Sequence, residues 1–485
     1  MKVVAAFVVN SMFNFVIGLL VAKFLAPEEY GRFALSLAIS IVVQTALFDW
    51  IRLAAVRFYS ARARVEQPQI RATLDYAFAA IASLLGLAVI AILMSGFELT
   101  LDIRLIALAI GVAVTNGLFD FNAALVRARF RDGLYGRLII TKNVLALGLT
   151  AGGALVFHSA YAALIGVCFS MAGSLLVTRD TLDDSTAPKG PAKRTVAMSL
   201  MRYSLPIVTA NVLYQMIPLA NRSAVTHLFG FAETGQFSLA YDIGVRLVSA
   251  IGAALDVVLF QIAVLVDATH GPARGRAQVA RNMTIVFSIV MPTCTGLWLT
   301  LPSAELVLVP AQFQGAFAHY LALLTPGLFA YAMINFAIYP IYQISKQTVP
   351  LIAAALVACL ADPLLVLILP RSADASSLAV AQSGAMIAAL VCLVGYASRL
   401  DCQWPAWRDL AAIMLASGAM TAALLPLRGL DPGPVVLATQ ILLGAAIYAM
   451  VALGLDVAGT RTLLIEQLRK KAWRSDPALG EHHDL

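Results

Sequence analysis

Residues 24–35 of this chain read FLAPEEYGRFAL, and residues 228–239 read LFGFAETGQFSL. When the first stretch is laid over the second with a shift of 204 residues, Glu, Gly, Phe and Leu coincide in the same order. Each stretch joins the end of one long apolar segment to the beginning of the next. The two stretches therefore predict that the chain is built from two related halves.

The composition of the chain favours lipid over water as its main solvent. Of its 485 residues, 60% are hydrophobic and only 13% are charged, with a mean hydropathy of +0.84. A soluble domain usually carries about 25% charged residues, so we expect an all-α integral membrane protein. The net charge of +7 does not indicate nucleic acid as a partner, because nearly all Lys and Arg residues lie in alternate loops between apolar segments.

Fourteen segments are apolar and long enough to cross a bilayer as helices, which requires about 20 residues each. The connections between them alternate between short ones and longer, basic ones. The expected helices cover residues 3–25, 33–51, 74–96, 105–126, 138–157, 160–178, 203–227, 235–264, 282–301, 317–344, 348–370, 376–398, 408–427 and 434–455.

The distribution of Lys and Arg predicts the orientation in the membrane. On these spans, 26 of them lie on the side of the longer connections, 5 lie on the other side and 3 lie within helices. Since positive residues are retained in the cytoplasm, we expect a multi-pass protein of the cytoplasmic membrane with both termini in the cytoplasm. The amphipathic stretch 463–473 is expected to lie on the inner leaflet.

The repeat also predicts the domain organisation. Because six helices separate its two copies, the halves have the same orientation and are related by an axis along the membrane normal. Transporters built in this way bind their substrate between the halves and expose it to each side in turn. We expect a six-helix bundle over residues 1–178, a flexible cytoplasmic linker over 179–202, a second six-helix bundle over 203–398, helices 13 and 14 over 399–455 and a cytoplasmic tail over 456–485.

Several short motifs, taken with their order and spacing, resemble the polysaccharide-transporter (Wzx-type) branch of the multidrug/oligosaccharidyl-lipid/polysaccharide flippase superfamily. The likeness covers roughly residues 1–400. The lipid II flippase branch is less similar, because residues 49–52, DWIR, replace its paired basic motif. The motifs that carry the resemblance are residues 24–31, Arg127 with Arg131, residues 204–206, Asn221 with Arg222, residues 235–241, and Pro292 with Gly296.

The resemblance implies a MATE-like fold and a flippase of the bacterial inner membrane that uses no cofactor. Its substrate would be an undecaprenyl-pyrophosphate oligosaccharide for O-antigen or exopolysaccharide. Membrane lipid, and polysaccharide polymerase and export proteins of the same pathway, would be its partners. The chain departs from the family pattern where Asn221 replaces an Asp, which bears on ion coupling, and where Pro310 replaces a Gly in an outward loop.

Polar side chains form stripes along several expected helices, which is hard to explain on a face that contacts lipid. At about 100° per residue, the members of each stripe lie on one side of their helix. We therefore predict a hydrated cavity between the halves. The stripes consist of Asn10 and Asn14 on helix 1; Asn116, Asp120 and Arg127 on helix 4; Ser204, Asn211, Gln215, Arg222 and Thr226 on helix 7; and Asp242, Arg246, Ser249 and Asp256 on helix 8.

Arginines in these stripes are the candidates for contact with an anionic headgroup, because a guanidinium offers a planar set of donors to phosphate. We expect Arg222 and Arg246 to bind substrate, together with Arg52, Asn211, Gln215, Asn10 and Asn14. The alternative for Arg246 is an internal ion pair with Asp242, one turn away. Asp49, Asp120, Asp242 and Asp256 are candidates for gating or ion coupling.

Two other ionisable residues are expected to have structural roles. Lys142 lies near the start of its helix, so its long side chain is expected to reach the membrane interface. Asp362 precedes Pro363 and is expected to cap a break in helix 11.

One face of helix 10 carries Tyr331, Asn335, Tyr339 and Tyr342, between Pro326 and Pro340, which are expected to kink the helix. Aromatic rings and an amide suit sugars, which present C–H patches and hydroxyls. The alternative is that these residues serve only in packing and at the membrane interface.

The motifs of several enzyme classes are missing from the sequence. It contains no Walker P-loop, HExxH or GxSxG motif, and its five cysteines are scattered without metal-binding spacing. We therefore expect no catalytic or metal-binding residues, and a flippase that works by alternating access. A multidrug-exporter-like cation antiporter is the alternative, and a membrane polysaccharide polymerase or ligase fits less well because the outward loops are short.

Overall fold

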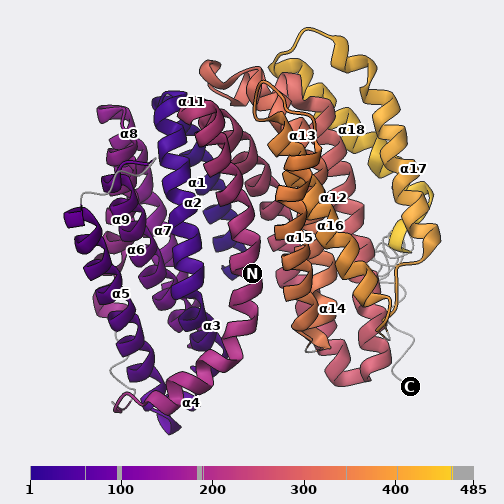
Figure 1. Cartoon of the computed structure of the whole chain (residues 1–485). Coiled ribbons are helices and arrows are strands. Elements are labelled where there is room, and N and C mark those ends of the chain that lie inside the picture. Colours follow the sequence, from indigo (N-terminus) through magenta and orange to yellow (C-terminus); the bar gives the residue numbers. More distant parts are fainter. Residues whose placement is uncertain are drawn as a thin grey trace, which may run out of the picture.

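A computed structural model of the chain describes residues 2–60, 62–95, 101–182, 188, 190–345, 347–400, 402–459 and 461. This part of the chain contains helices and no strands, as expected from the composition. Figure 1 shows two lobes whose ribbons approach each other at one end and spread apart toward the other end. The short connections between helices lie at the end where the lobes meet, and we call this the short-loop end. The longer, basic connections lie at the opposite end, which we call the basic-loop end.

The N-terminal lobe comprises the helices that precede residue 183. They are α1 (Lys2–Phe24), α2 (Pro27–Leu47), α3 (Asp49–Phe58), α4 (Ala63–Glu66), α5 (Gln69–Ser95), α6 (Ile103–Ala128), α7 (Asp132–Ala146), η1 (Leu147–Ala151), α8 (Gly152–Phe157), α9 (Ala160–Val177) and α10 (Arg179–Leu182).

The C-terminal lobe comprises the helices that follow. They are α11 (Arg194–His270), α12 (Pro272–Leu308), η2 (Ala311–Phe313), α13 (Ala316–Ala332), η3 (Met333–Ile338), α14 (Tyr339–Ile344), α15 (Val349–Ile368), α16 (Ser376–Ala397), α17 (Trp407–Leu424), η4 (Pro426–Gly429), α18 (Pro434–Gly454) and η5 (Val457–Gly459).

Twelve helices among the described residues are long and apolar enough to cross a membrane. The apolar part of α1, Val9–Phe24, falls short of that length, and α11 counts once although it contains the segments expected for helices 7 and 8. The multi-pass membrane fold is confirmed, whereas the count of fourteen stays a prediction.

The long helix α11 turns at Gly230, whose φ of 88° and ψ of 177° are accessible to glycine and strained for other residues. The Thr226 and Thr234 hydroxyls lie 2.8 Å apart across the turn, and the Thr234 hydroxyl donates to the Gly230 carbonyl. The turn therefore corresponds to the expected short connection between helices 7 and 8. Since α11 begins at Arg194, the linker expected over 179–202 is helical in its last nine residues, and that boundary was wrong.

The repeat seen in the sequence produces a reciprocal contact between the lobes. A Cβ at Gly31 on α2 would overlap the carbonyl oxygen of Phe231 on α11, and a Cβ at Gly235 would overlap the carbonyl oxygen of Pro27. Both pairs are related by the shift of 204 residues. The backbones of α2 and α11 can cross this closely only because both positions are glycine, and the contact has the twofold symmetry that the repeat predicts.

Prolines were expected to distort two helices, and the structure differs from the expectation in both. In the tenth expected span, a π-helical turn, Met333–Ile338, precedes Pro340. The proline ring crowds the carbonyl of residue 336 and supplies no N–H, so the helix widens before it. The break expected near Asp362 was wrong, because α15 runs through Pro363 as one helix from Val349 to Ile368.

Candidate functional site

Arg222, on the first half of α11, is held by internal contacts. Its guanidinium forms an ion pair with Asp242 on the second half of α11, and Nη1 donates to the Ala34 carbonyl of α2 at 2.9 Å. The ring of Tyr241 lies 5.5 Å from the guanidinium. Only 4% of the Arg222 side chain is exposed. Arg222 therefore connects α2 with both halves of α11 in this conformation.

Arg246 lies one turn after Asp242, on the second half of α11, and contacts the other lobe. Its Nη1 donates to the Asn14 carbonyl of α1 at 2.5 Å, and the side chain is partly exposed. A Cβ at Gly18, one turn after Asn14, would overlap this Nη1. The alternative expectation, that Arg246 pairs with Asp242, was wrong, because Asp242 pairs with Arg222.

Asp49 and Arg52 form a two-contact ion pair at the basic-loop end of the N-terminal lobe. Arg52 Nε and Nη2 donate to the two carboxylate oxygens of Asp49 at 3.0 and 3.2 Å. The helix that carries them, α3, is separated from α2 by a turn at Phe48. About a third of the Arg52 side chain is exposed, which leaves part of the guanidinium accessible.

A second set of polar side chains, which we call the N-lobe polar core, lies inside the N-terminal lobe. Gln44 of α2 donates to Asp120 of α6 at 2.8 Å. Lys142 and Asn143 of α7 donate to Asn10 Oδ1 of α1 at 3.0 and 3.2 Å. The core consists of Asn10, Ser40, Gln44, Asn116, Asp120, Lys142 and Asn143.

Lys142 does not reach the membrane interface, so that expectation was wrong. Its residue exposure is 6%, and its Nζ lies 5.9 Å from the centre of the Phe119 ring. Lys142 was expected near a helix end because the apolar span that contains it begins at residue 138. The structure begins α7 at Asp132, which moves Lys142 three turns into the helix.

The C-terminal lobe contains a buried polar group that the stripes did not include. The amide of Asn221 donates to Asp362 of α15 at 2.9 Å and to Gln382 of α16 at 3.2 Å. All three residues are at most 5% exposed. Asn221 is one of the residues that carry the resemblance to the flippase family. Its partners lie 141 and 161 residues away in sequence, so no local pattern connects them.

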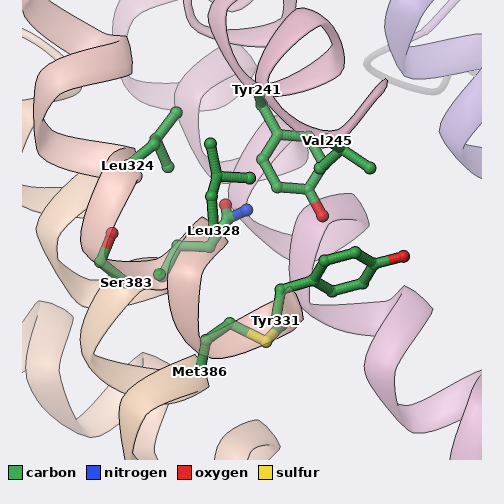
Figure 2. Close-up of a pocket in the computed structure, with 9 residues that line it drawn as sticks. Tyr241, Val245, Leu324, Leu328, Tyr331, Ser383 and Met386 are labelled. Carbon is green, nitrogen blue, oxygen red and sulfur yellow. The ribbon is translucent and has the colours of Figure 1, made fainter. Parts of the chain in front are cut away.

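The aromatic face expected for sugar binding is divided by the π-helical turn. Figure 2 shows Tyr331 and Tyr241 beside a cavity that is also lined by Leu328 and Met386. Its volume of about 10 Å³ is at most enough for one water molecule. The amide of Asn335 donates to the Tyr331 carbonyl of its own helix at 2.8 Å. In this conformation these residues pack within the lobe. Tyr339, at the start of α14, is also partly buried.

The remaining residues expected in the site lie on α11 and α1. On the first half of α11, Asn211 is partly buried and Gln215 is exposed, whereas Ser204 and Thr226 are buried. Asn14 on α1 is partly buried. Asp256 lies on α11, but its side chain is outside the described residues, as is the stretch 463–473.

Side chains from both lobes meet at the short-loop end. Gln312, in η2, donates through its amide to the carbonyls of Ala22 and Leu25 at the end of α1, at 2.9 and 2.7 Å. The ring of Phe313 packs edge-on against Tyr30 at 5.5 Å, and one hydrophobic cluster includes both residues. The helical turn that carries Gln312 begins after Pro310, the position where the sequence departs from the family pattern.

The arginines, amides and carboxylates described above form three separate groups, in the N-terminal lobe, between the lobes and in the C-terminal lobe. Within the described ranges, no three His, Cys, Asp or Glu side chains come together as they would to hold a metal ion.

Residues 20–317, more than half of the chain, match the family model described as "Polysaccharide biosynthesis protein". No curated protein matches the chain significantly in sequence. Among solved structures, the inward closed conformation of the lipid II flippase MurJ is similar with a TM-score of 0.72 and 15% identity, covering 95% of this chain and 99% of that one.

Two MATE transporters are similar over a smaller part of the chain. An inward-facing multidrug resistance MATE transporter has a TM-score of 0.54 and 15% identity, covering 80% of this chain and 94% of its own. A variant of the Vibrio cholerae MATE transporter VcmN has a TM-score of 0.51 and 15% identity, covering 81% and 94%. These likenesses establish the fold. The chain belongs to the polysaccharide biosynthesis protein family and has the fold shared by MurJ and the MATE transporters of the MOP superfamily.

Proposed function

We propose that the chain flips an undecaprenyl-pyrophosphate-linked oligosaccharide from the cytoplasmic to the periplasmic leaflet by alternating access. The observation that carries the proposal is Arg246, a partly exposed residue whose guanidinium lies between the two lobes and contacts α1. Family membership supports a substrate from polysaccharide biosynthesis. The two-lobe fold supports a mechanism in which the lobes move against each other.

The basic-loop end faces the cytoplasm in this proposal, as the distribution of Lys and Arg indicates. The contacts of Gln312 and Phe313 with the N-terminal lobe then hold the periplasmic side closed. A lipid-linked substrate enters from the inner leaflet, with its headgroup between the lobes and its hydrocarbon chain in the bilayer. The chain itself makes and breaks no covalent bond.

Arg246 and Arg52 are the residues that we assign to the anionic headgroup. Both are partly exposed, and a guanidinium binds phosphate through two parallel hydrogen bonds. The exposed amide of Gln215 and the partly exposed amide of Asn211 offer donors and acceptors for sugar hydroxyls. Arg222 is buried against Asp242, so we assign it to holding α2 against α11 rather than to first contact with substrate.

Glycan export in cells that depend on this chain tests the assignment. We expect Arg52→Ala and Arg246→Ala each to lower export about tenfold or more, the effect of removing one charged contact of about 1.4 kcal/mol. Arg57→Ala is the matched control, because Arg57 is an exposed arginine on the same helix as Arg52. Wild-type export by an Arg52→Ala, Arg246→Ala double variant that is inserted at normal levels would contradict the proposal.

Purified protein in vesicles separates the flippase from a multidrug antiporter. We expect movement of a polyprenyl-pyrophosphate glycan between leaflets and no uptake of a cationic dye in response to an ion gradient. Dye transport without lipid movement would favour the antiporter.

Single cysteines test the proposed orientation. Phe157, at the short-loop end, and Phe130, at the basic-loop end, are 69% and 83% exposed, so cysteine at either position is expected to be tolerated. In intact cells a membrane-impermeant thiol reagent should label Phe157→Cys and spare Phe130→Cys in a background without the native cysteines. The reverse pattern would overturn the orientation.

A further inference from the structure

We propose that the ammonium of Lys142 is a built-in cation of the N-lobe polar core, and that this core binds a monovalent metal cation when the ammonium is removed. Lys142 has no assigned part in substrate binding or in the contacts between the lobes. It is a buried amine with a residue exposure of 6%, in a segment that crosses the membrane.

The surroundings of the ammonium resemble those of a bound alkali-metal ion. An ammonium has three N–H donors, and Lys142 Nζ uses one of them on Asn10 Oδ1 at 3.0 Å. The adjacent Asn143 is fully buried, and its Oδ1 accepts no hydrogen bond from the described residues. Phe119 presents its ring to the ammonium at 5.9 Å. Side-chain oxygens and an aromatic ring are groups that stabilise a cation away from water.

More oxygen atoms lie on the two neighbouring helices. Gln44 and Asp120 are joined at 2.8 Å, and Ser40 and Asn116 lie one turn before them on α2 and α6. Both helices run from the short-loop end to the basic-loop end, so Ser40 and Asn116 are at about the same depth. Ser40 Oγ and Asn116 Oδ1 are buried and have no hydrogen-bond partner among the described residues. With Asn143 Oδ1, three buried side-chain oxygens of the core therefore have no hydrogen-bond partner among the described residues.

The charges in this part of the lobe balance only when Lys142 is counted. Asp49 is paired with Arg52 by two hydrogen bonds. Asp120 receives the Gln44 amide and lies within electrostatic range of Lys142, Arg52 and Asp49. A buried carboxylate without a compensating positive charge is strongly disfavoured. Removal of the ammonium leaves Asp120 and the free oxygens to recruit another cation.

Thermal unfolding of purified protein in detergent tests this inference without any transport assay. The variants are wild type and Lys142→Met, which removes the charge and keeps the length of the side chain. Midpoints are measured in NaCl, KCl and choline chloride at one ionic strength. For Lys142→Met we expect a saturable rise of about 3 °C or more in Na⁺ or K⁺ relative to choline, because a ligand that binds only the folded state raises its stability. Wild type should show no such difference.

The double variant Lys142→Met, Asp120→Asn is the matched control. It has lost both charges, so we expect its midpoint to exceed that of Lys142→Met in choline and to be independent of the cation. A Lys142→Met midpoint that is the same in all three salts would overturn the proposal. If Lys142→Met cannot be purified in any salt while the double variant can, Lys142 only neutralises Asp120, and the cation site is likewise rejected.

The result does not depend on the proposed flippase function. If Lys142→Met is stabilised by Na⁺ or K⁺ but the wild-type protein transports a different lipid, the proposed function is rejected and the inference is kept. If the stability of Lys142→Met is the same in all three salts but the wild-type protein exports the glycan, the function is kept and the inference is rejected.

Discussion

The guanidinium of Arg246 occupies the space that a side chain at position 18 would fill. Gly18→Ala places a methyl group against the flexible end of Arg246, so the side chain can move aside at little cost in stability but loses its bond to the Asn14 carbonyl. We expect normal insertion and thermal stability, with glycan export lowered about tenfold, as for loss of one charge-assisted hydrogen bond.

Gly86→Ala is the control for this variant, because a Cβ there meets no other atom within 4 Å. It should leave both export and stability unchanged or raise stability slightly. Normal export by Gly18→Ala would show that the position of the guanidinium is unimportant.

A different effect is expected where two backbones touch. Gly31→Ala and Gly235→Ala each direct a methyl group at a main-chain carbonyl of the facing helix, which cannot rotate away. We expect each variant to unfold at a lower temperature, with a loss of about 2 kcal/mol from overpacking. The double variant should lose less than the sum of the two, because one separation of α2 from α11 relieves both overlaps. Full additivity in a thermal-unfolding series would contradict a shared contact.

The amide of Gln312 is expected to favour closure of the short-loop end. Gln312→Leu keeps the bulk of the side chain but removes both donors to the carbonyls of α1. Spin labels at Phe157→Cys and Leu306→Cys, which lie on different lobes and are exposed, report the separation of the lobes at this end. We expect the distance distribution to shift toward longer values in Gln312→Leu. An unchanged distribution would show that the other contacts between the lobes keep this end closed without the Gln312 amide.

The amide of Asn221 is expected to be required opposite Asp362. Asn221→Asp replaces a donor with a second carboxylate at about 2.9 Å from the first in a buried site. Two buried carboxylates this close cannot both ionise. We expect a loss of stability of about 3 kcal/mol at neutral pH, measured by thermal unfolding. Asn221→Asp with Asp362→Asn restores one donor and one acceptor, and it should recover most of the loss.

The membrane fold and the twofold relation could be predicted from sequence because each has a local cause. A run of apolar residues is sufficient to predict a membrane-crossing helix, and the glycines at positions 31 and 235 are conspicuous within their matching stretches. Boundaries were less accurate. The turn at Gly230 lies in the connection expected between helices 7 and 8, whereas helix 7 was expected to begin at residue 203 and α11 begins at Arg194.

Partners of polar residues were harder to predict, because hydrogen bonds join distant segments. The sequence predicted that Arg222 and Arg246 bind substrate and that Asp242 serves in gating or ion coupling. The alternative, in which Asp242 pairs with Arg246 one turn away on the same helix, chose the wrong arginine. The turn at Gly230 brings Arg222 back against Asp242, 20 residues later. Lys142 and Asn10 are 132 residues apart, and Asn221 and Asp362 are 141 residues apart.

The contact between Gly18 and Arg246 has an evolutionary consequence. Gly18 in the first half and Arg222 in the second half are equivalent positions, because they are 204 residues apart. The same position of the repeat is therefore a glycine in one copy and an arginine in the other. Two identical subunits could not supply both, because every residue would occur twice about the symmetry axis. A site of this kind therefore requires two halves that differ in sequence at this position, so it could arise only after the two copies of the repeat had diverged.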